Sequence, residues 1–130
     1  MELYINTTHK DYLELALRER GKIVARKTIK TNFNQSEKLW PNLDKLLKAH
    51  KIKPPFAHTS KATEDKPTTL KKIVVASAGG SFTSLRIGIA AANALAFAWG
   101  IKVEDEQGHF KRSGGLQIVE PVYDREANIG

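Results

Sequence analysis

The chain has 130 residues, no cysteine, and 21 lysine and arginine residues against 14 aspartate and glutamate residues, which gives a formal net charge of +7. This length suits one domain rather than two lobes around a cleft, and the lack of cysteine excludes disulfides, thiolate zinc sites and cysteine nucleophiles. The amino terminus has no apolar signal region, and the apolar stretch 87–99 is shorter than the roughly 20 residues that cross a bilayer, so we expect a cytoplasmic protein without a membrane segment.

The first part of the chain predicts three antiparallel strands. Residues 2–6, "ELYIN", form a short apolar run. Residues 12–29 alternate apolar and polar side chains on both sides of Gly21. Alternation around a glycine turn is typical of a β-hairpin.

The next segment predicts a helix over residues 35–50, where leucines recur at helical spacing. Asn34 and Glu37 have the spacing of a capping box at its start. Pro41 removes one backbone hydrogen bond and should bend the helix near its second turn.

Residues 51–71 combine prolines with lysine, threonine and serine and show no periodicity, which predicts a mobile loop. Lysines are dense between residues 45 and 72. A positive segment of this kind fits either a solvated loop or an RNA-binding surface, although almost no aromatic residue is present there to stack on a base.

The next predicted element is "KIVVAS", residues 72–77, a continuous apolar run that is typical of a strand buried on both faces. The loop "AGGS" follows it, and Ser81 or Thr83 can cap a second helix. This helix should end at about Trp99, because Gly100 is a typical helix terminator.

The second helix is unusual in its lack of polar residues. Between Leu85 and Trp99, the only strongly polar side chains belong to Arg86 and Asn93. A helix that is covered on one side normally has a broad polar face. We therefore expect cover on two sides: its own sheet on one, and either another subunit or the first helix and the carboxyl-terminal tail on the other.

Residues 77–103, "SAGGSFTSLRIGIAAANALAFAWGIKV", resemble the signature of the TsaB family of tRNA threonylcarbamoyladenosine biosynthesis proteins, which are related to the glycoproteases. The segments "YINTT", "SEKLWPNLDKLLK" and "EPVYDREANIG" are similar to the family's first strand, first helix and last residues. The resemblance implies an α/β fold, a single lobe of the actin-like ATPase (RNase H-like) type. Its mixed sheet would begin with three antiparallel strands and carry the helices.

Two departures from the family limit the chemistry that the resemblance implies. The chain would form a single lobe over residues 1–130, with a flexible loop near 51–71 and a family-like tail at 115–130, whereas actin-like ATPases hold nucleotide between two lobes. The resemblance implies that the chain keeps only a remnant of the phosphate-binding loops. Its residues would be Asn6, Thr7, Gly79, Gly80 and Ser81. Asn6 stands where the family has aspartate, and an amide lacks the anionic oxygen that holds hydrated magnesium. The 4 histidines are scattered and lack the spacing of a metal site. Together with the single lobe and Asn6, this leads us to expect no cofactor, no metal site and no catalytic residue.

The resemblance implies a noncatalytic scaffold that binds a TsaD-like threonylcarbamoyltransferase, with a TsaE-like ATPase and tRNA as further members of the complex. We expect the contact surface on the two helices and the tail. Its residues would be Leu39, Leu43, Leu46, Arg86, Gly88, Ala92, Leu95, Tyr123 and Arg125. Two alternatives remain: a small nucleotide- or RNA-binding protein that uses residues 45–72 and the loop "AGGSFT", and a homodimer formed through the second helix.

The tail itself has strand character in Leu116, Ile118 and Val119. We expect residues 115–123 to add to the sheet or to cross its face. Tyr123 and Arg125 would then lie at the partner-facing end.

Overall fold

A mixed five-stranded sheet with the order β3-β2-β1-β4-β5 forms the centre of the protein. The computed structural model describes residues 1–32, 34–52 and 70–122. The strands are β1 (Glu2–Asn6), β2 (Tyr12–Glu19), β3 (Lys22–Lys30), β4 (Lys72–Val75) and β5 (Lys102–Asp105). β1, β2 and β3 are antiparallel, whereas β4 pairs in parallel with both β1 and β5. The predicted α/β class, with an antiparallel start to a mixed sheet, is confirmed.

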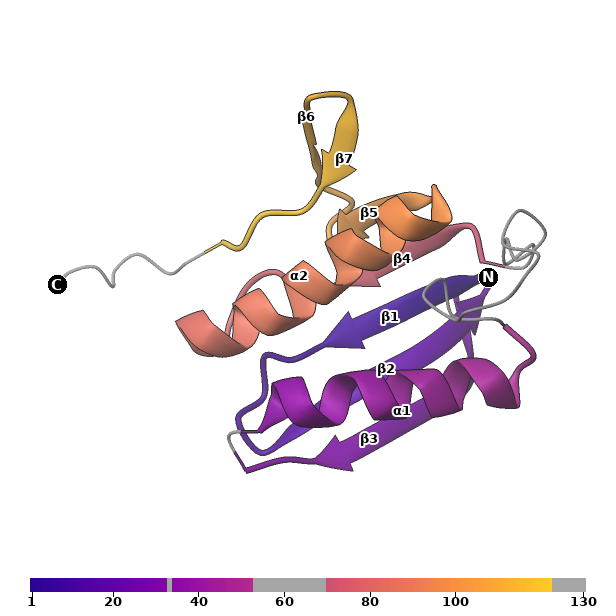
Figure 1. The fold of residues 1–130 in the computed structure, drawn as a ribbon, viewed down its shortest axis with the longest axis vertical. Helices are drawn as coiled ribbons and strands as arrows, with labels where there is room; N and C mark the ends of the chain where they lie inside the picture. The colour runs from indigo at the N-terminus through magenta and orange to yellow at the C-terminus, as the bar shows by residue number, and fades with distance from the viewer. Residues whose placement is uncertain (33, 53–69, 123–130) are drawn as a thin grey trace, which may run out of the picture.

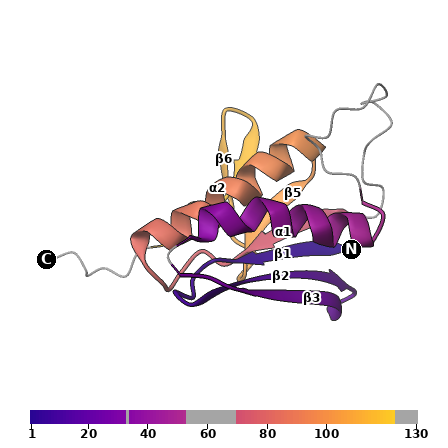
Figure 2. The ribbon, with the colours of Figure 1, turned by 60° about the horizontal axis from the view of Figure 1, so that its bottom comes forward.

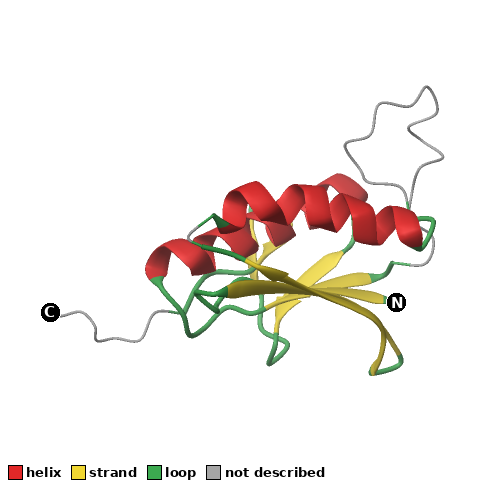
Figure 3. Ribbon diagram, turned by 90° about the horizontal axis from the view of Figure 1, so that it is seen from below, coloured by secondary structure: helices red, strands yellow, loops and turns green. Residues whose placement is uncertain are grey.

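Two helices, α1 (Gln35–Ala49) and α2 (Phe82–Trp99), cover one face of this sheet. α1 lies over β2 and β3, and α2 lies over β4 and β5 (Figure 1). Figures 2 and 3 show both helices on the same side of the strands. The largest fully buried side chains fill the space between the two layers: Leu3, Ile5, Leu13, Leu15, Leu17, Leu39, Leu43, Leu47, Ile73, Val75, Leu85 and Leu95.

The start of α1 differs from its prediction. Asn34 is the residue before the helix, but its side chain makes no capping hydrogen bond. Its Oδ1 atom instead accepts a hydrogen bond from the N–H of Asn32 at 2.8 Å. The carboxamide therefore closes the turn that precedes the helix, and the capping box expected from Asn34 and Glu37 does not form.

The ends of α2 agree with the sequence. The hydroxyl of Ser81 accepts a hydrogen bond from the N–H of Ser84 at 3.1 Å, and the Ser84 hydroxyl in turn accepts one from the N–H of Ser81. Gly100 ends the helix in the left-handed conformation, with φ of 69°. Neither α1 nor α2 combines the length and the hydrophobicity of a membrane-spanning segment.

The chain after β5 forms a separate hairpin of β6 (Lys111–Ser113) and β7 (Leu116–Ile118). The expectation that residues 115–123 add to the main sheet is wrong for β7, because the tight turn at Gly114 and Gly115 gives it β6 as a nearer partner. Val119 then returns to the core and is 3% exposed. Farther along, Val122 forms a parallel bridge with Ala78 and donates its N–H to the Ser77 carbonyl, so the end of this segment does pair with the chain that follows β4. Residues 123–130, with Tyr123 and Arg125, lie outside the described residues.

The predicted loop at 51–71 is described only at its two ends. Ile52 and Leu70 are both buried and belong to the core cluster. Residues 53–69 lie outside the described residues.

Candidate functional site at the carboxyl edge of the sheet

The parallel strands β1, β4 and β5 end at one edge of the sheet, which is where α/β proteins commonly place functional groups. The predicted phosphate-loop residues come together there. Gly80 has φ of +76°, and a Cβ atom on it would overlap the backbone of Thr8. The glycine loop after β4 is therefore closed against the turn after β1.

Asn6 uses its carboxamide within that turn. Its Oδ1 atom accepts hydrogen bonds from the N–H of Thr8 at 2.8 Å and from the Thr8 hydroxyl at 2.6 Å, and its Nδ2 atom donates to the Tyr4 hydroxyl at 3.0 Å. The residue is 8% exposed. Asn6 therefore acts as a turn residue, with its Oδ1 atom directed to Thr8 in the turn and its Nδ2 atom to Tyr4 in β1.

Thr7 joins β1 to α2. Its side chain is fully buried, and its hydroxyl donates a hydrogen bond to the carbonyl of Ser84. The same oxygen accepts a hydrogen bond from the N–H of Gly88 at 3.2 Å. The hydroxyl thus bridges two main-chain groups of the helix. Because Ser81 likewise caps α2, the hydroxyls of Thr7 and Ser81 both make hydrogen bonds that stabilise the fold. The phosphate-loop role of this group stays a prediction.

Asp105 is the residue at this edge that sequence patterns did not single out. Its Oδ1 atom accepts hydrogen bonds from the N–H groups of Gln107 at 2.9 Å and His109 at 2.8 Å. Its Oδ2 atom accepts one from the Ser77 hydroxyl at 3.2 Å. An aspartate with a glycine three residues later, here Asp105 and Gly108, is a sequence signal for such a turn. In this turn the carboxylate accepts hydrogen bonds from the main chain that follows it. Asp105 therefore closes the loop after β5 and ties it to the segment after β4.

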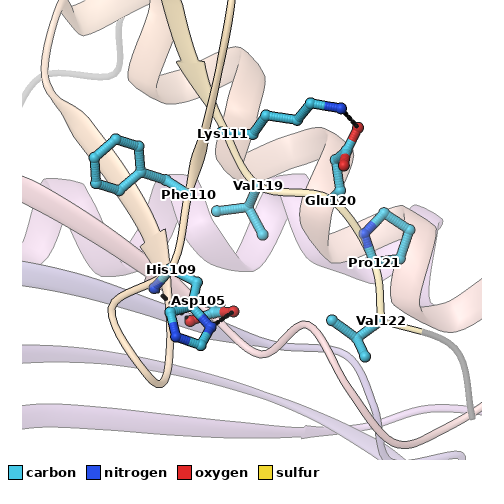
Figure 4. Close-up of a pocket in the computed structure, with 8 residues that line it drawn as sticks. All are labelled: Asp105, His109, Phe110, Lys111, Val119, Glu120, Pro121 and Val122. Carbon is cyan, nitrogen blue, oxygen red and sulfur yellow. Dashed lines mark hydrogen bonds and ion pairs between the residues drawn. The ribbon is translucent and has the colours of Figure 1, made fainter.

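A pocket of about 210 Å³ lies beside this loop. Figure 4 shows its lining: Asp105, His109, Phe110, Lys111, Val119, Glu120, Pro121 and Val122. The imidazole Nδ1 of His109 is 3.7 Å from the Asp105 carboxylate. The Ser77 hydroxyl bonds the carboxylate rather than the imidazole, so these three residues do not form the nucleophile and base pair of a hydrolase. Within residues 1–32, 34–52 and 70–122, no group of three or more acidic or histidine side chains has the arrangement of a metal site.

Tyr4 lies on the face of the sheet opposite the helices. Its hydroxyl donates a hydrogen bond to Glu106 Oε2 at 2.6 Å, and the Arg18 guanidinium lies 4.8 Å from the ring centre. Burial and the hydrogen bond to the Glu106 carboxylate raise the pKa of Tyr4 above its ordinary value. This tyrosine connects β1 to the loop after β5 in its protonated form.

Lys72 carries the charge pairing on the same face. Its ammonium lies 3.0 Å from Glu104 and 3.4 Å from Glu2. The hydrogen bond to Glu104 is the main reason that the pKa of Lys72 is raised, although partial burial opposes it. The three side chains link β1, β4 and β5.

The structure corrects most of the predicted partner surface. Six of its residues lie inside the protein: Leu39, Leu43, Leu46, Gly88, Ala92 and Leu95. Helical spacing identified the apolar sides of the helices, but these sides pack against the chain's own sheet. They are not available to a partner of the folded chain. Arg86 is exposed on α2, and its role in binding stays a prediction.

The outer side of α2 nevertheless has the composition of a contact surface. Its exposed residues are Thr83, Arg86, Ala90, Ala94, Phe97 and Ala98. Phe97 is 69% exposed. An apolar groove of about 520 Å³ separates the end of this helix from β7, and Leu116 forms part of its wall. Exposed apolar side chains that gather beside a groove are typical of protein contacts. We call the exposed residues of α2, together with Leu116, the α2 surface.

Comparison with protein families matches residues 29–105 to the model described as TsaD, tRNA N6-adenosine threonylcarbamoyltransferase. No curated protein matches the chain. Among solved structures, YeaZ from Pseudomonas aeruginosa is similar with a TM-score of 0.62 and 16% identity over 93% of this chain and 64% of that chain.

A second solved structure, an uncharacterized protein with similarity to peptidase YeaZ from Pseudomonas aeruginosa, gives a TM-score of 0.62 and 16% identity over 93% of this chain and 63% of that one. The chain thus spans just under two thirds of the length of both structures. This likeness confirms the predicted actin-like, RNase H-like fold.

Proposed function

The chain belongs to the TsaD family of tRNA N6-adenosine threonylcarbamoyltransferases, because its residues 29–105 match the family model, and from this premise we propose that it is a noncatalytic, TsaB-like partner subunit of that tRNA modification machinery. Its role would be to bind a TsaD-like enzyme that transfers the threonylcarbamoyl group to tRNA adenosine. A TsaE-like ATPase and tRNA would be further members of the complex. The YeaZ-like fold supports the TsaB-like assignment.

The α2 surface is the observation that carries the proposal. Phe97, near the carboxyl end of α2, has most of its side chain in solvent, and the exposed alanines beside it leave room for a second helix to approach closely. Burying one such aromatic side chain in a partner contributes roughly 1.5–3 kcal/mol. Arg86, the only charged residue of α2, lies near the other end of the helix and is suited to fix the orientation of a partner through a carboxylate.

The carboxyl edge of the sheet supports the noncatalytic part of the proposal. The carboxamide of Asn6 and the hydroxyl of Thr7 are engaged in bonds that hold the lobe together. Each group would have to give up these bonds to bind a magnesium ion or to activate a water molecule. The chemistry would then belong to the TsaD-like enzyme.

Co-purification from the native host tests this function. A tagged chain should recover a TsaD-like protein, and a chain with Ala94→Glu should not, because the new carboxylate would lie in the contact. Lys38→Glu, an exposed change on α1, is the matched control and should leave recovery intact. Recovery of RNA without a TsaD-like protein would favour the RNA-binding alternative, and recovery of the chain alone as a dimer would favour the homodimer.

A further inference from the structure

The outer edge of β3 is a second surface, separate from α2. β3 is the longest strand of the sheet, with 9 residues, and it lies at the end of the strand order (Figure 1). Within the described residues, no strand pairs with its outer side. Alternate N–H and C=O groups of such an edge point outward and are free to pair with another extended chain.

Part of this edge is regular and held in place. The pairing of β2 with β3 runs without interruption from Lys30 to Ala25. The register then shifts, because Leu17 and Arg18 of β2 pair with Ala25 and Ile23, which leaves Val24 of β3 as the extra residue of a bulge. Ala25 and Ile29 both pack against the hydrophobic core. The segment Ala25–Lys30 is therefore already in strand conformation, so a partner strand would not have to order it.

The charge of this segment selects what can pair with it. Its sequence, "ARKTIK", contains three cations and no acidic residue. Arg26 pairs with Glu14 at 2.9 Å, yet 57% of its side chain remains exposed. In the described part of the chain, no carboxylate lies within ion-pair distance of Lys27 or Lys30. A second copy of β3 would bring further cations and no acidic residue to this edge, and the net repulsion disfavours that pairing.

We propose that the edge Ala25–Lys30 of β3 binds an extended acidic segment of a partner protein, which adds to the sheet as an outer strand. The register gives the recognition pattern. In an antiparallel partner, acidic residues would lie opposite Lys30, Lys27 and Arg26, and small or apolar residues would lie at the other positions. The hexapeptide Glu-Val-Thr-Glu-Glu-Val has this pattern.

A protein strand fits this edge better than RNA does. An RNA backbone would use the cations but not the outward N–H and C=O groups. Ile23 and Val24, just before the regular segment, are 51% and 49% exposed and offer apolar contact to a polypeptide. The proposal does not rest on the TsaB-like function, because it concerns a different surface. β3 is at one edge of the sheet, whereas α2 packs mainly on β4 and β5 near the other edge.

Titration with the hexapeptide and with its reversed sequence, which would pair in parallel, tests the proposal on the full chain. One of the two should bind and should slow hydrogen exchange at alternate amides of residues 25–30. N-methylation of alternate peptide nitrogens keeps the charge but removes main-chain donors, and should weaken binding by about tenfold. Replacement of each peptide glutamate by lysine should abolish binding.

Protein variants separate this edge from general charge attraction. Lys27→Glu together with Lys30→Glu should lower the affinity about tenfold at low salt. Lys38→Glu together with Lys45→Glu changes the net charge equally on α1 and should have no effect. Equal losses in the two double variants, failure of both peptides to bind, or an unchanged affinity after N-methylation would overturn the proposal. Binding of oligouridylate in preference to both peptides, without slower exchange in β3, would overturn it in favour of RNA.

Discussion

The buried side chain of Thr7 occupies the space beside Gly88 that a side chain at that helix position would need. A Cβ atom on Gly88 would lie 2.5 Å from Thr7 Oγ1 and 3.1 Å from its methyl carbon. Thr7 cannot turn away freely, because its hydroxyl bridges the Ser84 carbonyl and the Gly88 N–H. The close contact between β1 and α2 thus depends on glycine here.

Gly88→Ala should therefore destabilise the protein. The gain in helix propensity, up to about 1 kcal/mol, opposes the overpacking, and we expect a net loss of about 1–2 kcal/mol in the free energy of unfolding. Urea denaturation measures this loss. Combining Gly88→Ala with Thr7→Ala should cost less than the sum of the two single changes, because the second removes the atoms that the first would overlap. Strict additivity would contradict the packing described.

Asn93 holds the chain after β7 against α2, and its loss should loosen that segment. Its Nδ2 atom donates to the Val119 carbonyl at 3.0 Å, and its Oδ1 atom accepts from the Val119 N–H at 2.9 Å. Asn93→Ala should lower the free energy of unfolding by about 2 kcal/mol. It should also speed hydrogen exchange at Val119, whereas the exposed neighbour Ala94→Ser should do neither.

Deletion of residues 115–130 should also lower the melting temperature, because it removes Val119 from the core. A truncated chain with an unchanged melting temperature and unchanged partner binding would show that this segment contributes nothing to the fold.

The sequence predicted the sheet and both helices because their signals are local. Gly21 marks the hairpin, and Ser81 and Gly100 mark the ends of α2. Which apolar helix residues are buried depends on tertiary packing and could not be predicted. Ala92 and Ala94 are alike in sequence, but Ala92 is buried and Ala94 is exposed. The role of Asp105 was missed because its partner Ser77 lies on a different strand connection, and only the fold brings the two together.

Tyr4 should lose its proton late in an alkaline titration. Its pKa is raised above the ordinary 10.0, so the folded chain holds the proton more tightly than the unfolded chain does. The contribution of Tyr4 to stability is therefore fully present below pH 10.0 and is lost as the pH rises through the raised value. Tyrosinate absorbance measures this, and Tyr4→Phe should remove the last phase. Glu106→Gln should move that phase to lower pH, and an unchanged phase would contradict the assigned hydrogen bond.

Asp105 should contribute to stability through its two acceptor oxygens. Asp105→Ala leaves the N–H groups of Gln107 and His109 without their acceptor, and we expect a loss of about 2–3 kcal/mol in the free energy of unfolding. Asp105→Asn keeps one carbonyl oxygen and should cost less. Chemical denaturation of the two variants compares them, and equal losses would show that the turn does not depend on this acceptor.

Calorimetric titration of the chain with a TsaD-like enzyme from the same host tests the proposed function most directly. We expect the unaltered chain to bind and Phe97→Glu to bind at least about tenfold more weakly, because a charged group would replace the aromatic side chain of the α2 surface. Phe97 is exposed, so the variant should keep its melting temperature, and Lys27→Glu on β3 should keep its affinity. No binding by the unaltered chain, or equal binding by Phe97→Glu, would contradict a partner subunit that docks through α2.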